Sequence, residues 1–326
     1  MTYAIEAHGL TKRFGNTQAL DGIDLEVAEG RVLGVLGPNG AGKTTAVRIL
    51  ATLLKPDSGT ARVAGHDVVT DASAVRRLIG LTGQYASVDE DLTGIENLVM
   101  IGQLLHLSRA QARVRADELL AEFELAEAGK RLAKTYSGGM RRRLDLAASL
   151  VGRPSVVYLD EPTTGLDPAK RDDVWEMVRN LTRAGTTVLL TTQYLEEADA
   201  LAEEITVIDH GRVIAHDTPE GLKRELGGQT LEVRPASIRD MDAVTALLAR
   251  VGTRAPEHPS HDLVSVAVAD DAALTHTVVA LAEAGIAVTE LSLRLPSLDE
   301  VFYSLTGHAA ASADDVAAPT LEGASA

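Results

Sequence analysis

The nine residues from Gly37 to Thr45 read GPNGAGKTT, which fits the phosphate-binding pattern G-x-x-x-x-G-K-[ST]. Glycines let several backbone N–H groups turn toward one anion, and a following helix adds its positive N-terminal end. The apolar run RVLGVLG precedes the loop and suits a buried parallel strand, and TTAVRILATLL follows with helical spacing. We therefore expect an α/β fold in which this loop joins a strand to a helix. The nucleotide-binding candidates in the loop are Gly37, Pro38, Asn39, Gly40, Ala41, Gly42, Lys43, Thr44 and Thr45.

Within this loop, we expect Lys43 to reach the β- and γ-phosphates of a nucleotide and the Thr44 hydroxyl to bind Mg²⁺. The segment VVYLDEP supplies a second element of the same site. Asp160 comes at the end of an apolar strand, where it can hold Mg²⁺ through water, and Glu161 can polarise an attacking water. A phosphate loop alone also fits a kinase, a GTPase or a motor, so other segments must decide the class.

A third element is YSGGMRRRLDLA, residues 136–147. Ser137, Gly138 and Gly139 stand before a strongly helical run, so they form another helix N-terminus with exposed N–H groups and a hydroxyl. The sequence therefore predicts one phosphate loop but two anion-binding elements.

Composition limits the classes of partner. The 326 residues are enough for two domains, and a net charge of −16 disfavours nucleic acid, which is bound largely through lysine and arginine. Cysteine is absent, which excludes disulfides and thiolate zinc sites. No apolar run approaches the ~18 residues that a membrane span needs, and the N-terminus lacks an apolar signal core. We expect a cytoplasmic protein whose work at a membrane would require a partner that supplies the spans.

The pattern along the chain indicates several segments. Residues 86–135 have helical periodicity and many Ala, Leu and Glu, which indicates a helical insert, and residues 195–204 predict a further helix. Near residue 228 the pattern resets to β-α-β-α-β, with a further strand near residues 252–258 left open, which suggests a small ferredoxin-like domain. Residues 308–326 are rich in Ala, Ser, Asp and Pro and are expected to be a disordered tail.

The YSGGM segment is similar to the signature motif of ATP-binding cassette (ABC) ATPases, and the Asp-Glu pair follows it at that family's spacing. The resemblance implies that the signature of one subunit covers the γ-phosphate held by the loop of another, so that a homodimer has two composite ATP sites. It also implies that Phe14 stacks on adenine and that Gln84 senses Mg²⁺ and water. Asp167, in the GLD segment that begins at Gly165, would couple the two sites.

At two positions the sequence differs from the usual ABC pattern, and these differences indicate a smaller group within the family. Gln193 stands where most of the family has histidine, and its amide can donate to the γ-phosphate but does not titrate near pH 7. The base role therefore falls to Glu161. Met140 replaces the usual glutamine of the signature. With these departures YSGGMRRRL, LLTTQYLEEAD and LPSLDEVFYSLTG resemble the daunorubicin/doxorubicin-resistance ATP-binding subunits, over residues 4 to about 307.

This resemblance implies an α/β P-loop NTPase cassette over residues 4–227, with a RecA-like core, an antiparallel β subdomain and a helical subdomain. A small α+β ferredoxin-like domain is expected over residues 228–307. The implied activity is hydrolysis of ATP with Mg²⁺, which energises a separate transmembrane permease for drug or antibiotic efflux at the inner face of the cell membrane. The alternatives are lipid or polysaccharide export, or a soluble ABC ATPase without transport, and the membrane partner would distinguish them.

Overall fold

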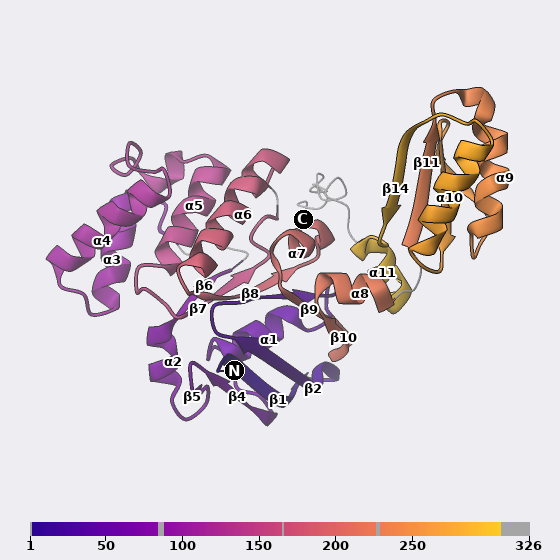
Figure 1. Ribbon diagram of the computed structural model, residues 1–326. Coiled ribbons are helices and arrows are strands. Elements are labelled where there is room, and N and C mark those ends of the chain that lie inside the picture. Colours follow the sequence, from indigo (N-terminus) through magenta and orange to yellow (C-terminus); the bar gives the residue numbers. More distant parts are fainter. Residues whose placement is uncertain (1, 84–87, 165, 226–228, 308–326) are drawn as a thin grey trace, which may run out of the picture. The chain divides into compact units, whose positions relative to one another are not determined.

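The computed structural model describes residues 2–83, 88–164, 166–225 and 229–307, and the chain divides after His216 into two compact units (Figure 1). Each unit is described by itself. Gln84, Gly165 and the expected tail lie outside the described residues, and the domain limits expected from the sequence stay predictions. In the described part, no helix is long and apolar enough to cross a membrane.

The first unit contains an antiparallel sheet with strand order β2-β1-β4-β5. Residues that alternate between buried and exposed positions build its strands, as expected for a sheet with one face on the core. Its strands are β1 (Tyr3–Phe14), β2 (Thr17–Ala28), β4 (Ser58–Val63) and β5 (His66–Asp67).

A second, mainly parallel sheet of the same unit has the order β10-β9-β3-β8-β7-β6. Every residue of β3, β7 and β8 is buried, as expected for parallel strands that are covered on both faces. The strands are β3 (Val32–Leu36), β6 (Ile79–Thr82), β7 (Val156–Asp160), β8 (Thr187–Thr192), β9 (Glu204–Asp209) and β10 (Arg212–Asp217).

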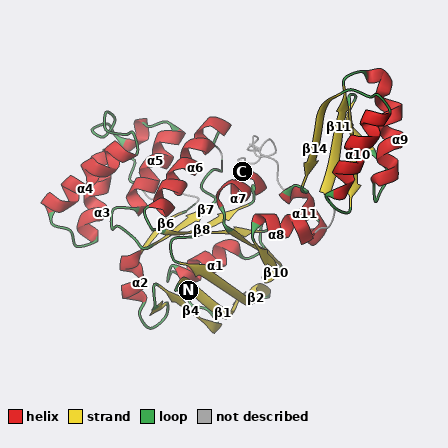
Figure 2. Ribbon diagram, in the orientation of Figure 1, coloured by secondary structure: helices red, strands yellow, loops and turns green. Residues whose placement is uncertain are grey.

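Helices cover this sheet on both sides. Helix α1 lies between the two sheets, where its buried residues join one core with both of them, while α5, α6 and α7 cover the far side of the parallel sheet (Figure 2). The helix predicted for residues 195–204 ends at Leu201, because Glu204 already begins β9. The helices are α1 (Lys43–Leu50), α2 (Ala72–Leu78), α3 (Gly94–Leu104), α4 (Arg109–Glu122), the 3₁₀ turn η1 (Ala133–Thr135), α5 (Gly138–Ser149), α6 (Pro168–Arg183) and α7 (Leu195–Leu201).

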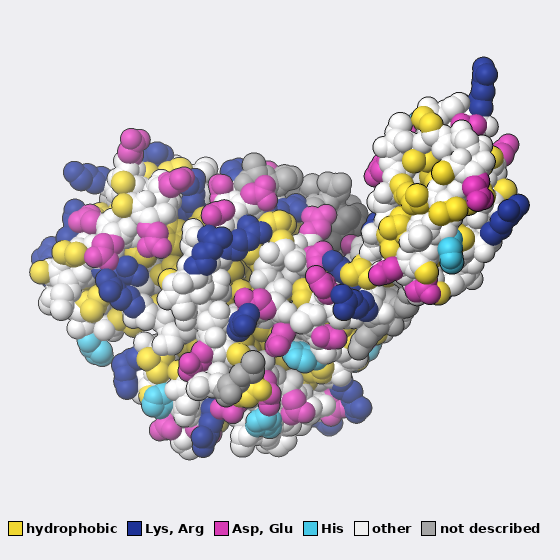
Figure 3. All heavy atoms as spheres, in the orientation of Figure 1, with side chains coloured by type: hydrophobic (Ala, Val, Ile, Leu, Met, Phe, Trp, Pro, Cys, Tyr) yellow, Lys and Arg dark blue, Asp and Glu magenta, His cyan; other side chains and the backbone are white. Residues whose placement is uncertain are grey.

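The second unit contains an antiparallel sheet with the order β12-β13-β11-β14 and two helices, α9 and α10, whose buried residues share its core. This is the β-α-β-β-α-β order of a ferredoxin-like fold, so the predicted fold class is confirmed. Hydrophobic side chains gather on the visible face of this unit (Figure 3). Two valines of α10, Val278 and Val279, are 47% and 51% exposed. The elements are α8 (Pro219–Glu225), β11 (Gln229–Pro235), the 3₁₀ turn η2 (Ile238–Asp240), α9 (Met241–Val251), β12 (Glu257–Ser260), β13 (Leu263–Val268), α10 (Ala272–Glu283), β14 (Val288–Arg294) and α11 (Leu298–Thr306).

One carboxyl group is buried deep in the first unit. Glu197, on α7, is only 1% exposed, and the hydroxyls of Thr163 and Thr192, the indole of Trp175 and the guanidinium of Arg142 surround it. Burial is the largest influence and raises the pKa of Glu197 to about 7, because the surrounding groups compensate only part of the lost hydration. The folded chain therefore holds a proton on Glu197 at pH values where the unfolded chain has released it.

This difference predicts how stability responds to pH. Because the folded pKa is raised above 4.5, the stability that Glu197 contributes is complete at low pH and is lost as the pH rises toward about 7. In Glu197→Gln this loss disappears, so the free energy of unfolding of the variant, relative to wild type, should increase by on the order of 2 kcal/mol between pH 5 and pH 8. Urea unfolding followed by the fluorescence of Trp175, the single tryptophan, measures it.

The matched control is Glu196→Gln, which changes the exposed neighbour on the same helix and should shift stability equally at every pH. A constant difference between Glu197→Gln and wild type across the pH range would contradict the assignment.

Candidate functional site

The phosphate loop connects β3 to α1, and two of its glycines stand where no side chain fits. Gly42 has a φ of 113°, and a Cβ there would lie 2.5 Å from the carbonyl oxygen of Ala19 on β2. A Cβ on Gly37 would meet the carbonyl oxygen of Ile208 on β9. The backbone of the loop is therefore packed directly against two strands of different sheets.

The ammonium group of Lys43 lies across this loop. Its Nζ donates to the carbonyl of Gly37 at 2.6 Å and to that of Pro38 at 3.1 Å, and the residue is 5% exposed. Burial lowers the pKa of Lys43, while the negative charges of Glu161 and Asp160 act in the opposite direction. The structure thus places a buried cation inside the loop, where it would compensate the charge of a phosphate.

The remaining residues of the loop differ in their exposure. Asn39 and Gly40 are exposed at its tip, whereas Ala41 is buried. Thr44 and Thr45 lie in the first turn of α1 and are half-buried.

The register of the parallel sheet places the candidate catalytic and phosphate-binding residues at one edge of the sheet. Leu36, the last residue of β3, pairs with Thr192 of β8, and Asp160, the last residue of β7, pairs with Thr191. The phosphate loop, Glu161 and Gln193 therefore all follow the carboxyl ends of neighbouring strands, which is where ligands bind in open α/β sheets.

Asp160 links this edge to α1. Its Oδ1 accepts from the hydroxyl of Thr44 at 3.3 Å and from the hydroxyl of Thr191 on β8. A carboxylate and a hydroxyl are hard oxygen donors of the kind Mg²⁺ prefers, so these two residues fit the expected ion. Among the described residues there is no group of three or more His, Asp or Glu side chains that could hold a metal.

Glu161 has an unusual backbone. Its φ is 51°, a left-handed conformation that costs about 1–2 kcal/mol in residues with a Cβ. Its N–H donates to the carbonyl of Thr191 at 2.9 Å, and its Oε2 accepts from the hydroxyl of Thr164 at 3.3 Å. Backbone conformations of this kind persist where the surrounding structure enforces them, and they cluster at active sites.

The second anion-binding element is the start of α5. Ser137 caps the helix, its Oγ accepting from the N–H of Met140 at 3.3 Å. Ser137 and Gly138 are exposed, whereas Gly139 is buried under Lys170, whose Cδ would lie 2.7 Å from a Cβ at that position. In the described residues no hydrogen bond joins Ser137 to the phosphate loop of the same chain.

Two further candidates, Asp167 and Phe14, lie at other places in the cassette. Asp167 caps α6, accepting from the N–H of Lys170 at 3.1 Å and forming an ion pair with its ammonium group. Phe14 ends β1 with half of its surface exposed, and the ammonium of Lys12 lies 5.8 Å from its ring centroid. The ring is therefore accessible for stacking. Gln84 is outside the described residues.

Sequence reasoning missed Arg142, on the second turn of α5. Its guanidinium donates to the carbonyls of Pro162 at 2.8 Å, Gly83 at 3.0 Å and Glu161 at 3.5 Å. The run RRR does not reveal which arginine points inward. Helical spacing from the buried Gly139 and to the buried Leu146 is the signal that would have singled out Arg142.

Comparison with known proteins agrees with this geometry. A sequence model described as ABC transporter matches residues 20–164. The daunorubicin resistance ATP-binding protein DrrA2 of Streptomyces coeruleorubidus is 56% identical over 308 residues, which cover 94% of this chain and 96% of that protein. The daunorubicin/doxorubicin resistance ATP-binding protein DrrA of Streptomyces peucetius is 54% identical over 310 residues, covering 95% and 94%.

Among solved structures, a dimeric ATP-binding cassette in a post-hydrolysis state, bound to ADP and Pi, is similar to this chain. It has 26% identity and a TM-score of 0.60, covering 66% of this chain and 98% of that chain.

The matched family segment contains the phosphate loop, the Ser-Gly-Gly element and the Asp160–Glu161 pair. Identity above one half extends over nearly the whole chain, so it includes the C-terminal unit as well. The family and the activity expected from the sequence are thereby confirmed. The chain belongs to the ATP-binding subunits of ABC transporters, in the family of the daunorubicin and doxorubicin resistance ATP-binding proteins, and its cassette hydrolyses ATP.

Proposed function

We propose that this chain is the ATP-hydrolysing subunit of a drug exporter and that it drives a separate membrane permease. The observation that carries the proposal is the high identity, over nearly the full length of both chains, to proteins named for daunorubicin and doxorubicin resistance. The subunit would lie at the cytoplasmic face of the membrane, bound there by its permease.

Because the candidate residues gather at one edge of the sheet, each can be given a role in binding or hydrolysing ATP. Lys43 would neutralise the β- and γ-phosphates of ATP, and the ring of Phe14 would stack on adenine. Glu161 would accept the proton of a water whose oxygen forms a bond to the γ-phosphorus, while the bond from that phosphorus to ADP breaks and phosphate leaves. The amide of Gln193 would donate to a γ-phosphate oxygen and so orient it.

Thr44, Asp160 and Gln84 would hold Mg²⁺, which supplies positive charge to the phosphates when bound.

We further propose that two copies assemble with ATP between them. Ser137 and Gly138 are exposed at a helix N-terminus, so they are accessible to a nucleotide held by another copy. Asp167 would lie close to the partner's site, as the family resemblance implies. The dimeric cassette bound to ADP and Pi supports this arrangement. ATP would favour the closed dimer because it binds that state better than the open one.

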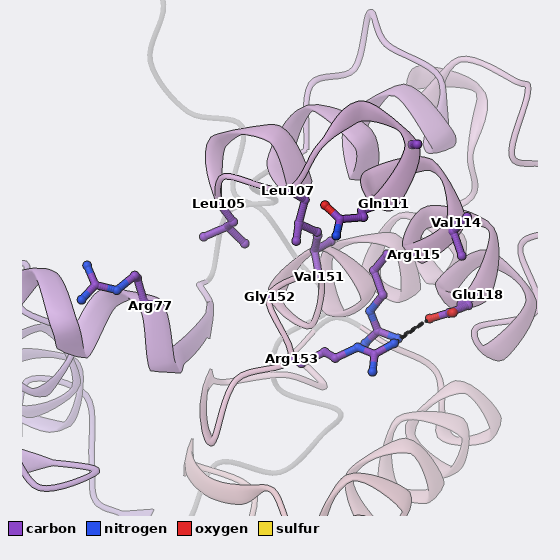
Figure 4. A pocket seen from close by; sticks show the side chains of 11 residues that line it. Arg77, Leu105, Leu107, Gln111, Val114, Arg115, Glu118, Val151, Gly152 and Arg153 are labelled. Atoms are coloured by element: carbon purple, nitrogen blue, oxygen red, sulfur yellow. Dashed lines mark hydrogen bonds and ion pairs between the residues drawn. The ribbon is translucent and has the colours of Figure 1, made fainter.

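We propose that the permease docks in a groove on the first unit. It has a cavity volume of about 600 Å³, and Figure 4 shows side chains from α2, α4 and the segments after α3 and α5 around it. Leu105, Leu107, Val114 and Val151 give it an apolar wall. The other side chains are mainly charged and include Arg77, Arg115, Glu118 and Arg153.

The charges of this groove indicate the chemistry of its occupant. Three arginines and one glutamate line it, and Glu118 pairs with Arg115 at 3.1 Å and with Arg153 at 3.2 Å. The groove is therefore net positive on a chain whose net charge is −16. A short amphipathic segment of the permease, with an apolar face and acidic flanks, fits these properties.

The exporter function is tested by co-expressing the tagged chain with the membrane protein encoded beside it and measuring ATP hydrolysis across a panel of amphipathic drugs. Drug-stimulated hydrolysis that requires the membrane protein is the expected result. Hydrolysis that is fast without any membrane protein, and unchanged with one, would favour a soluble ATPase.

Replacing the base tests the catalytic assignment. Glu161→Gln keeps the size of the side chain but cannot take a proton, so kcat should fall by at least about 100-fold while the Kd for ATP changes little. Single-turnover hydrolysis and the binding of a fluorescent ATP analogue measure the two quantities. Wild-type turnover in this variant would show that Glu161 is not the base.

The residue after β8 gives a second test. Gln193→His keeps a hydrogen-bond donor at this position and makes it one that can titrate, so hydrolysis should be at least as fast as in wild type. Its pH profile should gain an inflection near the ordinary pKa of histidine, about 6.5. Measuring kcat from pH 5.5 to pH 8.5 checks both points, and complete loss of activity would mean that the site requires the amide.

Docking is tested by Val114→Asp, which places a carboxylate in the apolar wall at a side chain that is 60% exposed. Binding of the permease in pull-down should weaken at least about tenfold, and permease-dependent hydrolysis should be lost with it. Leu53→Asp, at a residue that is 61% exposed and outside the groove, is the matched control and should behave as wild type. Equal effects of the two substitutions would place the docking surface elsewhere.

A further inference from the structure

The guanidinium of Arg142 joins three segments that are far apart in the sequence. Its Nε donates to the carbonyl of Pro162 at 2.8 Å, and its Nη2 to that of Glu161 at 3.5 Å. Its Nη1 donates to the carbonyl of Gly83, the residue before Gln84, at 3.0 Å. One side chain on α5 therefore holds the peptide of the proposed base and the start of the segment that carries Gln84.

Buried carboxyl groups next to the guanidinium of Arg142 hold it in position. The side chain of Arg142 is 14% exposed, and its Nη1 lies 3.4 Å from a carboxylate oxygen of Asp145, whose side chain is fully buried. The carboxylate of Asp160 also attracts it, and the buried Glu197 does so at pH values where its carboxyl group is ionised. A buried arginine with this many acceptors is held in one geometry, because its planar fork directs each N–H separately.

Arg142 and Ser137 belong to the same helix, so a movement of the signature segment is passed on to the contacts of Arg142. Arg142 follows Ser137 by five residues on the same helix, about 7.5 Å at 1.5 Å per residue. A helix moves as a rigid body over such a distance, so any displacement of Ser137 carries the guanidinium with it. The Glu161 peptide is sensitive to such a displacement, because a φ of 51° persists only where the surrounding contacts enforce it.

We propose that Arg142 is a positioning residue that couples the signature helix to Glu161. When Ser137 engages the nucleotide of the other copy, α5 settles in one position, and Arg142 then fixes the Glu161 carbonyl and the Gly83 carbonyl together. Glu161 is aligned for proton transfer only when the composite site is closed, so hydrolysis requires the closed dimer. This inference rests on the proposed roles of Glu161 and Ser137.

Two substitutions of Arg142 test the proposal in the complex with the permease. Arg142→Gln and Arg142→Lys both lose the planar fork, and lysine keeps the charge. Both should lower kcat about 10- to 100-fold, as expected when a base is misplaced by a fraction of an ångström to an ångström. The KM for ATP and the Kd of a fluorescent ATP analogue should stay within about threefold of wild type.

The matched control is Arg143→Gln, the next arginine of the same helix, which is partly buried and pairs with the exposed Glu124 at 3.0 Å. It should leave kcat, KM and the thermal unfolding midpoint near their wild-type values. A loss of kcat in Arg142→Gln with a parallel loss of nucleotide binding would indicate a purely structural role and overturn the proposal, as would wild-type kcat.

The double variant separates this inference from the role of Glu161. If Arg142 acts through the base, Arg142→Gln should cause no further loss in a Glu161→Gln background. Losses that multiply in the double variant would overturn the coupling while leaving the base assignment intact. Wild-type turnover in Glu161→Gln alone would overturn the base assignment, and the coupling with it.

Discussion

The carboxylate of Asp160 is the contact on which the arrangement of this site depends. It accepts from Thr44 on α1 and from Thr191 on β8, so this side chain at the end of β7 connects the helix after the phosphate loop to two neighbouring strands, β7 and β8. Thr191 in turn holds the N–H of Glu161 through its own carbonyl. Because all these groups lie at the carboxyl edge of one sheet, the parallel register, rather than any loop, determines how far the phosphate loop, Asp160 and Gln193 lie from one another.

Much of this could be predicted from the sequence, because the patterns involved are local. The phosphate loop, the acidic pair after β7 and the Ser-Gly-Gly start of α5 each depend on residues a few positions apart, and each lies on the element expected for it. The ferredoxin-like order of the C-terminal unit followed from strand and helix periodicity. The pattern leaves a further strand near residues 252–258 open, and the structure has β12 at Glu257–Ser260, where the sequence EHPS lacks the alternation that marks a strand.

What the sequence did not reveal depends on contacts across long separations. Arg142 reaches Gly83, which lies 59 residues earlier in the chain, and Pro162, which lies 20 residues later. The burial of Glu197 results from three elements closing around it, and nothing in LEEAD distinguishes it from the exposed Glu196. The short strand β6, with the sequence IGLT, was also not predicted, because its sheet neighbour β7 comes more than 70 residues later.

The groove of Figure 4 shares no residue with the phosphate loop, with the turn after β7 or with the segment after β8. Its walls come from α2, α4 and the segments after α3 and α5, while the chemistry lies at the sheet edge. Substitutions can therefore accumulate in one place without changing the other. If the permease docks in this groove, as proposed, substitutions on the helical surface would change which membrane partner binds while the catalytic residues stay the same.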